Sequence, residues 1–124
     1  MFLFMCMVEY LGKIYNYEEK ERLLRELERE GYMCEDVGGS SFILHVNERV
    51  TVDGEGKWFT YISEGRLGYT THEYVCVKEG QRAIVRRMGR EESEEGYYVW
   101  DATFELTTSG LRKLYGFSEF EKRE

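Results

Sequence analysis

Proline is absent from this chain of 124 residues, and side-chain amides are almost absent. The amides are limited to Asn16, Asn47 and Gln81, whereas Glu, Arg and Lys are abundant. A charge-rich, amide-poor composition is typical of proteins from heat-loving organisms, because amides are thermolabile and ion pairs form networks at high temperature. We therefore expect a thermophile-like protein, although the lack of proline excludes rigid proline loops as a source of its heat stability.

Hydrophobic runs long enough to cross a membrane are also lacking. The apolar segment 1–8 is much shorter than the roughly 20 residues of a spanning helix, and it lacks the flanking signals of a secretory leader. The formal net charge of −7, from 24 acidic and 17 basic side chains, disfavours nucleic acid and anionic membranes as partners. We expect a cytoplasmic protein without a membrane partner, and leave open whether translation starts at Met1, Met5 or Met7.

Motifs for metal binding and for the common catalytic mechanisms are missing as well. The three cysteines, Cys6, Cys34 and Cys76, are widely spaced and form no CxxC or Cys/His cluster. We interpret them as small buried apolar residues in a reducing compartment, and leave open a disulfide between two of them in a hyperthermophile. His45 and His72 have no second ligand at metal spacing, and no serine elbow or phosphate-binding loop is present. No metal, cofactor or catalytic residue is predicted.

A helix is predicted near the start of the chain. Asn16 and Glu19 match a capping box, and Leu23 and Leu27 belong to an apolar row at helical spacing. Gly31 is placed to end the helix. Because the length is usual for one domain and no linker or repeat interrupts it, we expect a single α+β domain over residues 1–124.

The remaining sequence alternates short β-type segments with turn signals. Together with an apolar first segment near 2–14, strands are predicted near 32–37, 41–52, 57–63, 69–78, 81–89 and 97–106. Short turns between successive strands favour antiparallel pairing. The predicted fold is therefore a predominantly antiparallel meander of about six or seven strands, with one long helix after the first strand.

A second, short helix is predicted at the C-terminal end of the chain. Residues 107–109 resemble a helix cap, and Leu111, Leu114 and Tyr115 then recur at helical spacing. Gly116 is placed to end this helix.

One hairpin permits a predicted register. If Glu79-Gly80 is a two-residue turn, then Val75 lies opposite Ile84 and Glu73 lies opposite Arg86. The face with Val75 and Ile84, continued by the even positions of the next strand around Trp100, is the predicted core. The other face, which includes His72, Tyr74 and Arg87, is less polar than a solvated face usually is, so we expect something to cover it.

Aromatic residues are abundant, with ten tyrosines and two tryptophans. They occupy both faces of the predicted strands, so one aromatic row must lie away from the core. Tyr and Trp are common where part of a side chain stays in contact with water, as in a pocket or a protein interface. The candidate ligand or interface residues are Trp58, Tyr61, His72, Glu73, Tyr74, Arg86, Arg87 and Tyr97.

These features predict a non-catalytic interaction domain that binds itself, as a homo-oligomer, or another protein through an aromatic sheet face or edge. The alternative is a domain that binds a small ligand or hydrolyses a phosphate ester in a pocket between a curved sheet and the helix. Glu73, Arg86 and Asp101 are the residues expected to act in that pocket. The sequence leaves open whether the chain is an enzyme.

Overall fold

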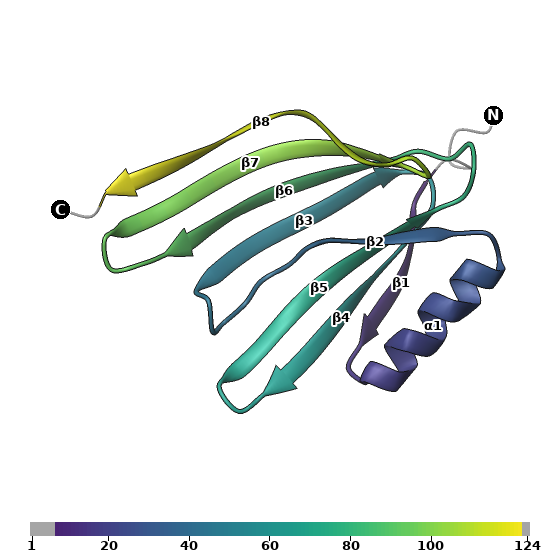
Figure 1. Cartoon of the computed structure of the whole chain (residues 1–124), viewed down its shortest axis with the longest axis horizontal. Helices are drawn as coiled ribbons and strands as arrows, with labels where there is room; N and C mark the ends of the chain where they lie inside the picture. Colours follow the sequence, from purple (N-terminus) through teal and green to yellow (C-terminus); the bar gives the residue numbers. More distant parts are fainter. Residues whose placement is uncertain (1–6, 123–124) are drawn as a thin grey trace.

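The computed structural model describes residues 7–122, which form one helix and eight strands in two four-stranded sheets (Figure 1). The elements are β1 Glu9–Ile14, α1 Tyr17–Arg29, β2 Met33–Gly38, β3 Val46–Gly54, β4 Lys57–Gly65, β5 Gly68–Val77, β6 Ala83–Glu92, β7 Gly96–Thr107 and β8 Gly110–Lys122. The first sheet has the strand order β1-β4-β5-β2, and the second sheet has the order β3-β6-β7-β8. Neighbouring strands are antiparallel, except that β1 and β4 are parallel.

The predicted class is therefore confirmed in outline, with more strands than expected. The described residues form a mostly antiparallel α+β structure with eight strands, where six or seven were predicted. The first strand is confirmed from Glu9 to Ile14, and its predicted part before residue 7 lies outside the described residues. The strand predicted near 41–52 begins only at Val46, because residues 42–45 form turns.

The helix α1 begins and ends as the sequence predicts. The Asn16 side chain accepts a hydrogen bond from the backbone N–H of Glu19 at 3.1 Å, which caps the first turn. At the other end Gly31 has a φ of 95°, and the N–H of Tyr32 donates to the carbonyl of Leu27 at 3.0 Å. This is a Schellman motif, in which glycine adopts the left-handed conformation without steric cost. Within residues 7–122, no helix is long and apolar enough to cross a membrane.

The chain crosses from one sheet to the other after β2, after β3 and after β5, and the last two crossings are short. The chain passes from β3 to β4 and from β5 to β6 through turns of a few residues, although the strands on either side belong to different sheets. The two crossings lie side by side, since the N–H of Glu55 donates to the carbonyl of Arg82 at 2.9 Å. Gly54 lies so close to the Arg82 carbonyl that a Cβ there would clash.

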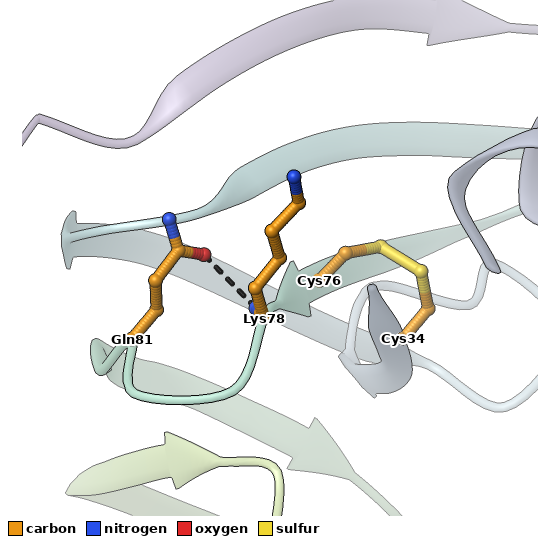
Figure 2. The surroundings of a disulfide bond; sticks show 4 residues. All are labelled: Cys34, Cys76, Lys78 and Gln81. Atoms are coloured by element: carbon orange, nitrogen blue, oxygen red, sulfur yellow. Dashed lines mark hydrogen bonds between the residues drawn. A yellow bond between two sulfur atoms is a disulfide. The ribbon is translucent and has the colours of Figure 1, made fainter. Parts of the chain in front are cut away.

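The predicted hairpin register around residues 79 and 80 is wrong for this reason. Gln81 and Lys78 do form a turn, in which the N–H of Gln81 donates to the Lys78 carbonyl at 2.9 Å. The N–H of Lys78 donates in return to the Gln81 side-chain oxygen, also at 2.9 Å (Figure 2). Beyond the turn the strands separate, so that Glu73 pairs with Thr60 of β4 and not with Arg86 of β6. A tight turn reverses the chain direction, but it does not decide which neighbour a strand bonds.

The main apolar core lies between the two sheets. Its buried residues are Val37, Val50, Val52, Val75, Val77, Ala83, Val85 and Leu106. We call the sheet faces that carry these residues the inner faces, and the opposite faces the outer faces. The predicted core positions are correct for Val75 in β5 and Leu106 in β7, whereas β6 buries Ala83 and Val85 in place of Ile84.

The helix covers the outer face of the first sheet, beside β1 and away from β8 (Figure 1). Leu23, Leu24 and Leu27 pack there in a second apolar cluster. Phe59 and Cys76 are the fully buried strand residues beneath them. The expectation of a covered apolar face is therefore confirmed for β5, where Tyr74 packs against the helix cluster, whereas Arg87 of β6 lies on the inner face of the second sheet.

The predicted C-terminal helix is wrong, because this segment is the strand β8. Residues 108 and 109 form a hairpin turn, and β8 then pairs with β7 along its length. The register jumps from Lys113 to Tyr115, which leaves Leu114 as a β-bulge. The bulge shifts the alternation by one residue, so Leu111, Leu114 and Tyr115 acquire a spacing that imitates a helix.

A disulfide joins Cys34 in β2 to Cys76 in β5, where the two residues lie directly opposite each other (Figure 2). It belongs to the cluster beneath α1, in which Cys76 is fully buried. The interpretation of these two residues as reduced cysteines is therefore wrong, and the disulfide that the sequence left open is formed. Cys6 lies outside the described residues.

Reduction of this disulfide is expected to lower the free energy of unfolding by about 4 kcal/mol, because it releases a loop with a sequence separation of 42 residues. The measurement is urea unfolding with and without reductant, in a Cys6→Ser background that removes the third thiol. In the control variant Cys34→Ala/Cys76→Ala, reductant should change nothing. Equal stability of the oxidised and reduced chain would contradict the expectation.

Candidate functional site

A buried carboxylate lies on the inner face of the second sheet, where the apolar core ends. The side chain of Glu48 in β3 is fully buried. Its Oε1 accepts from the N–H of Gly39 at 2.7 Å and from Arg87 Nη2 at 3.2 Å. Its Oε2 accepts from Arg87 Nε at 2.9 Å and from Trp100 Nε1 at 2.7 Å. Because these bonds use the acceptor positions of both oxygens, Glu48 is a structural group with no lone pair left for a substrate.

A second carboxylate, Glu73 in β5, lies on the inner face of the first sheet. Its Oε1 accepts from Trp58 Nε1 at 2.7 Å and from Thr60 Oγ1 at 2.6 Å. The Tyr10 hydroxyl lies 2.8 Å from Thr60 Oγ1 and must donate to it, since the one hydroxyl hydrogen of Thr60 points to Glu73. Glu73 Oε2 has no hydrogen-bond partner among the described residues, so this carboxylate, unlike Glu48, can still accept a bond.

A glycine allows these polar groups of the two sheets to approach each other. Gly38 pairs with Glu73 in the β2–β5 ladder. It also lies against the Glu48–Arg87 ion pair, where a Cβ would clash with both side chains. Its φ of 136° independently favours glycine. The inner-face polar groups therefore form one cluster that spans both sheets. We call it the polar neighbourhood, and it consists of Glu48, Arg87 and Trp100 in the second sheet and Trp58, Thr60 and Glu73 in the first.

A cleft of about 370 Å³ opens on the inner face of the second sheet beside this neighbourhood. Its lining includes Arg87, Trp100, Ala102, Phe104, Lys113 and Ser118. The volume lies at the small end of the range for small-molecule sites, roughly 300–1,000 Å³. Of the candidates predicted from the sequence, Arg87 is the one that lines this cleft.

Two other predicted candidates, Tyr61 and Tyr74, lie beneath α1 on the outer face of the first sheet. Lys20 of α1 is buried over them, with Nζ 5.0 Å from the ring centre of Tyr61 and 5.8 Å from that of Tyr74. Burial lowers the pKa of Lys20, but the hydrogen bond to Glu21 and the nearby tyrosines outweigh it, so the pKa is raised. Burial raises the pKa of Tyr74, partly opposed by Lys20. The ammonium group of Lys20 thus occupies the position over the Tyr61 and Tyr74 rings that a cationic ligand would take.

The predicted candidate His72 lies on the same outer face. Its ring stacks on Tyr61 with centres 5.8 Å apart, and its Nδ1 lies 3.0 Å from Oδ2 of Asp36 in β2. Asp101 and Glu105 belong to β7 of the other sheet, so the carboxylate beside His72 is that of Asp36. The imidazole and its carboxylate therefore link β5 to β2 beside the Tyr61 ring, on the face opposite the polar neighbourhood.

The last two predicted candidates lie on the outer face of the second sheet. Arg86 donates hydrogen bonds to both carboxylate oxygens of Asp101, at 2.9 and 2.7 Å. The guanidinium carbon of Arg90 lies 4.2 Å from the ring centre of Tyr97. The structure therefore brings Arg86 and Asp101 together but places Glu73 on an inner face of the other sheet. The three residues of the predicted hydrolase site do not share one pocket.

Sequence reasoning missed Glu48 and Lys113, and treated Trp100 as core. Glu48 had a usable signal, because it interrupts an alternating apolar row that continues at Val50 and Val52. A lone charge in such a row predicts a buried, bonded group. Lys113 had no such signal, because the bulge after it hides which face it occupies.

Comparison with models of known families, with curated proteins and with solved structures found no match. Among residues 7–122, no group of His, Cys, Asp and Glu side chains is arranged to hold a metal ion. The function therefore has to be inferred from the geometry of the inner faces, the exposed edges and the exposed surface.

Because both carboxylate oxygens of Glu48 already accept hydrogen bonds, a small substitution at this position is expected to have a large effect on stability. Glu48→Gln should lower the free energy of unfolding by about 2–4 kcal/mol, because the new NH₂ group meets donors in a buried place. The matched variant Glu73→Gln should lose less than about 1 kcal/mol, since its amide oxygen can replace Oε1 and its NH₂ faces no donor. Urea unfolding measures both values, and equal losses would show that the two carboxylates are not bonded differently.

The Arg86–Asp101 pair predicts a pKa change. The hydrogen bond from Arg86 holds the pKa of Asp101 below its ordinary value. The ionised carboxylate therefore stabilises the fold above its ordinary pKa, and this contribution disappears as the pH falls through the lowered pKa. In Arg86→Gln the pKa of Asp101 should rise, as read from a carboxyl ¹³C NMR titration. Arg90→Gln, a change on the same face of β6, should leave it unchanged, and no rise in Arg86→Gln would refute the assignment.

Proposed function

We propose that this chain is a non-catalytic interaction domain that pairs with a second copy of itself through the free edge of β8. The observation that carries the proposal is the order of charges along that strand, which is complementary to its own reverse. An open backbone edge and exposed aromatic side chains on the same strand support it.

The edge of β8 is open over a long segment. β8 is the last strand of the second sheet and has 13 residues, of which one side pairs with β7. No strand among the described residues pairs with its other side. Unpaired backbone N–H and C=O groups on such an edge are a template for another strand, and proteins usually shield long edges that do not pair.

The side chains of β8 are apolar where an exposed strand is usually polar. Tyr115, Phe117 and Phe120 are 67%, 52% and 44% exposed. Phe120 lies against Tyr98 of β7, with ring centres 5.1 Å apart. Exposed apolar groups gathered on one element are typical of interaction surfaces.

The charges along β8 select a second copy of the chain as the partner. The first half of the strand carries Arg112 and Lys113, whereas the second half carries Glu119 and Glu121, before Lys122 at its end. Antiparallel pairing of two identical strands around a two-fold axis sets the first half of each against the second half of the other. Arg112 of one copy then faces Glu119 and Glu121 of the other, because all three lie on the outer face of the sheet, and this favours the pairing.

The predicted cytoplasmic location and thermophilic source remain proposals that support each other. Disulfides are rare in the cytosol of most organisms but occur in intracellular proteins of hyperthermophiles. A cytoplasmic chain with the Cys34–Cys76 bond therefore fits the heat-loving source that the amide-poor composition predicts.

Self-association is expected to weaken when the acidic half of β8 becomes basic. In Glu119→Lys/Glu121→Lys, like charges face each other across the two-fold axis, and the dissociation constant should rise by about tenfold or more. Sedimentation velocity over a concentration series up to about 1 mM measures it, a range in which even a weak dimer is populated. The matched control is Glu28→Lys/Glu30→Lys, with the same charge change on exposed residues at the end of α1.

Two outcomes would overturn the proposal. One is a wild-type chain that stays monomeric over the whole concentration range. The other involves a separate exposed apolar surface at the turn before β3 and the β4–β5 hairpin, made of Phe42, Ile43, Leu44, Leu67 and Tyr69. If Ile43→Ser/Leu44→Ser abolished self-association while the β8 variant retained it, the interface would lie on that surface and not on β8.

A further inference from the structure

The cleft on the inner face of the second sheet exists because small residues form its floor. Ala102 in β7 lies opposite Gly116 in β8, and a Cβ on Gly116 would clash with Ala102. Trp100 and Phe104 occupy the inner-face positions before and after Ala102, roughly 13 Å apart along the strand. The floor is therefore a shallow hollow with an aromatic wall at each end.

The Trp100 wall is held in place without a ligand. Its Nε1 donates to the buried Glu48 at 2.7 Å. Its ring lies over Gly89 of β6, where a Cβ would clash with the indole. Because a hydrogen bond and a close backbone contact fix the ring, binding a flat molecule against it would cost little ordering of the side chain.

Two cationic side chains border the hollow. Arg87 lies opposite Ala102 on the β6 side, and Lys113 lies opposite Phe104 on the β8 side. Glu48 compensates the charge of Arg87 through Nε and Nη2, which leaves Nη1 without a partner among the described residues. Lys113 has no ion pair within residues 7–122. The cleft thus holds one uncompensated positive charge in a chain whose net charge is −7.

We propose that this cleft binds a small aromatic carboxylate, with its carboxylate held by Lys113 and Arg87 and its ring lying between Trp100 and Phe104. The Ser118 hydroxyl, opposite Trp100 in the β7–β8 ladder, is a further donor at the rim. The proposal does not depend on self-association through β8.

The charge and shape of the cleft set the ligand class. One uncompensated cation matches a monoanion, whereas a polyphosphate brings several negative charges that nothing in the cleft would neutralise. The apolar floor and two aromatic walls favour a flat ring over a sugar or another polar body. Guanidinium and ammonium groups are the donors that bind carboxylates most strongly.

The test uses 2-naphthoate as the probe and its neutral amide, 2-naphthamide, as the matched control. The chain has two tryptophans, so ¹H–¹⁵N spectra contain two indole signals, which a Trp100→Phe variant assigns. Addition of 2-naphthoate should shift the Trp100 signal and leave that of Trp58, which is bonded to Glu73 in the other sheet. The amide should bind about tenfold or more weakly, the factor expected for the loss of a charge-assisted hydrogen bond.

A substitution of Lys113 then tests whether its ammonium group binds the carboxylate of the probe. Lys113→Met should weaken 2-naphthoate binding by about tenfold and remove the preference over the amide. Lys122→Met deletes the other lysine of β8, which lies opposite Gly96 at the far end of the strand, and should bind both probes like the wild type. Because Lys113 is exposed, its substitution is not expected to unfold the chain, and the unchanged remainder of the spectrum verifies this.

Three results would overturn the proposal. The first is no change of the Trp100 signal with either probe. The second is equal affinity for the carboxylate and the amide in the wild type. The third is a loss of binding in Lys122→Met as large as that in Lys113→Met, which would indicate a general effect of charge rather than a site.

Discussion

The burial of one apolar layer between two sheets is the constraint on which the rest of the structure depends. The layer is built largely from valine, with Val50 and Val52 on one side and Val75 and Val77 on the other. Each buried side chain of this size stabilises the fold by roughly 1.5–3 kcal/mol relative to exposure. To bring both faces together, the chain crosses between the sheets after β2, after β3 and after β5. The last two crossings are bonded to each other, so the apolar layer and these connections form a single unit.

The polar neighbourhood is the consequence of where that layer stops. Beyond Val50, the next inner-face position of β3 is Glu48, which is buried and would be costly there without partners. Arg87, Trp100 and the backbone of Gly39 supply them. The same bonds fix the indole and the guanidinium that border the cleft. A structural requirement, the satisfaction of a buried charge, therefore pre-arranges the walls of the proposed ligand site.

The two sheets differ in how their outer surfaces are covered. The first sheet has α1 over its outer face and the Cys34–Cys76 disulfide across two of its strands. The second sheet ends in β8, whose far side has no partner among the described residues. Both proposed interactions therefore use the second sheet, one through the edge of β8 and one through the inner face of β6, β7 and β8. The first sheet, which the helix covers, supplies the buried side chains on the other side of the core, such as Val75 and Val77.

Local patterns in the sequence determined the features that depend on neighbouring residues. The cap at Asn16, the stop at Gly31 and most strand positions follow from side chains within a few residues of one another, so they were predicted correctly. The identity of the strand partners was decided by burial. β5 turns tightly toward β6 but bonds β4 and β2, because both inner faces must close on one core. The bulge at Leu114 made a strand resemble a helix, and it hid Lys113 from the prediction of the site. Only the tertiary structure decided which distant residues meet. The partners of Glu48, the disulfide pair and the cleft over Ala102 each join segments that are far apart in the sequence. No pattern among neighbouring residues indicates that such segments come together.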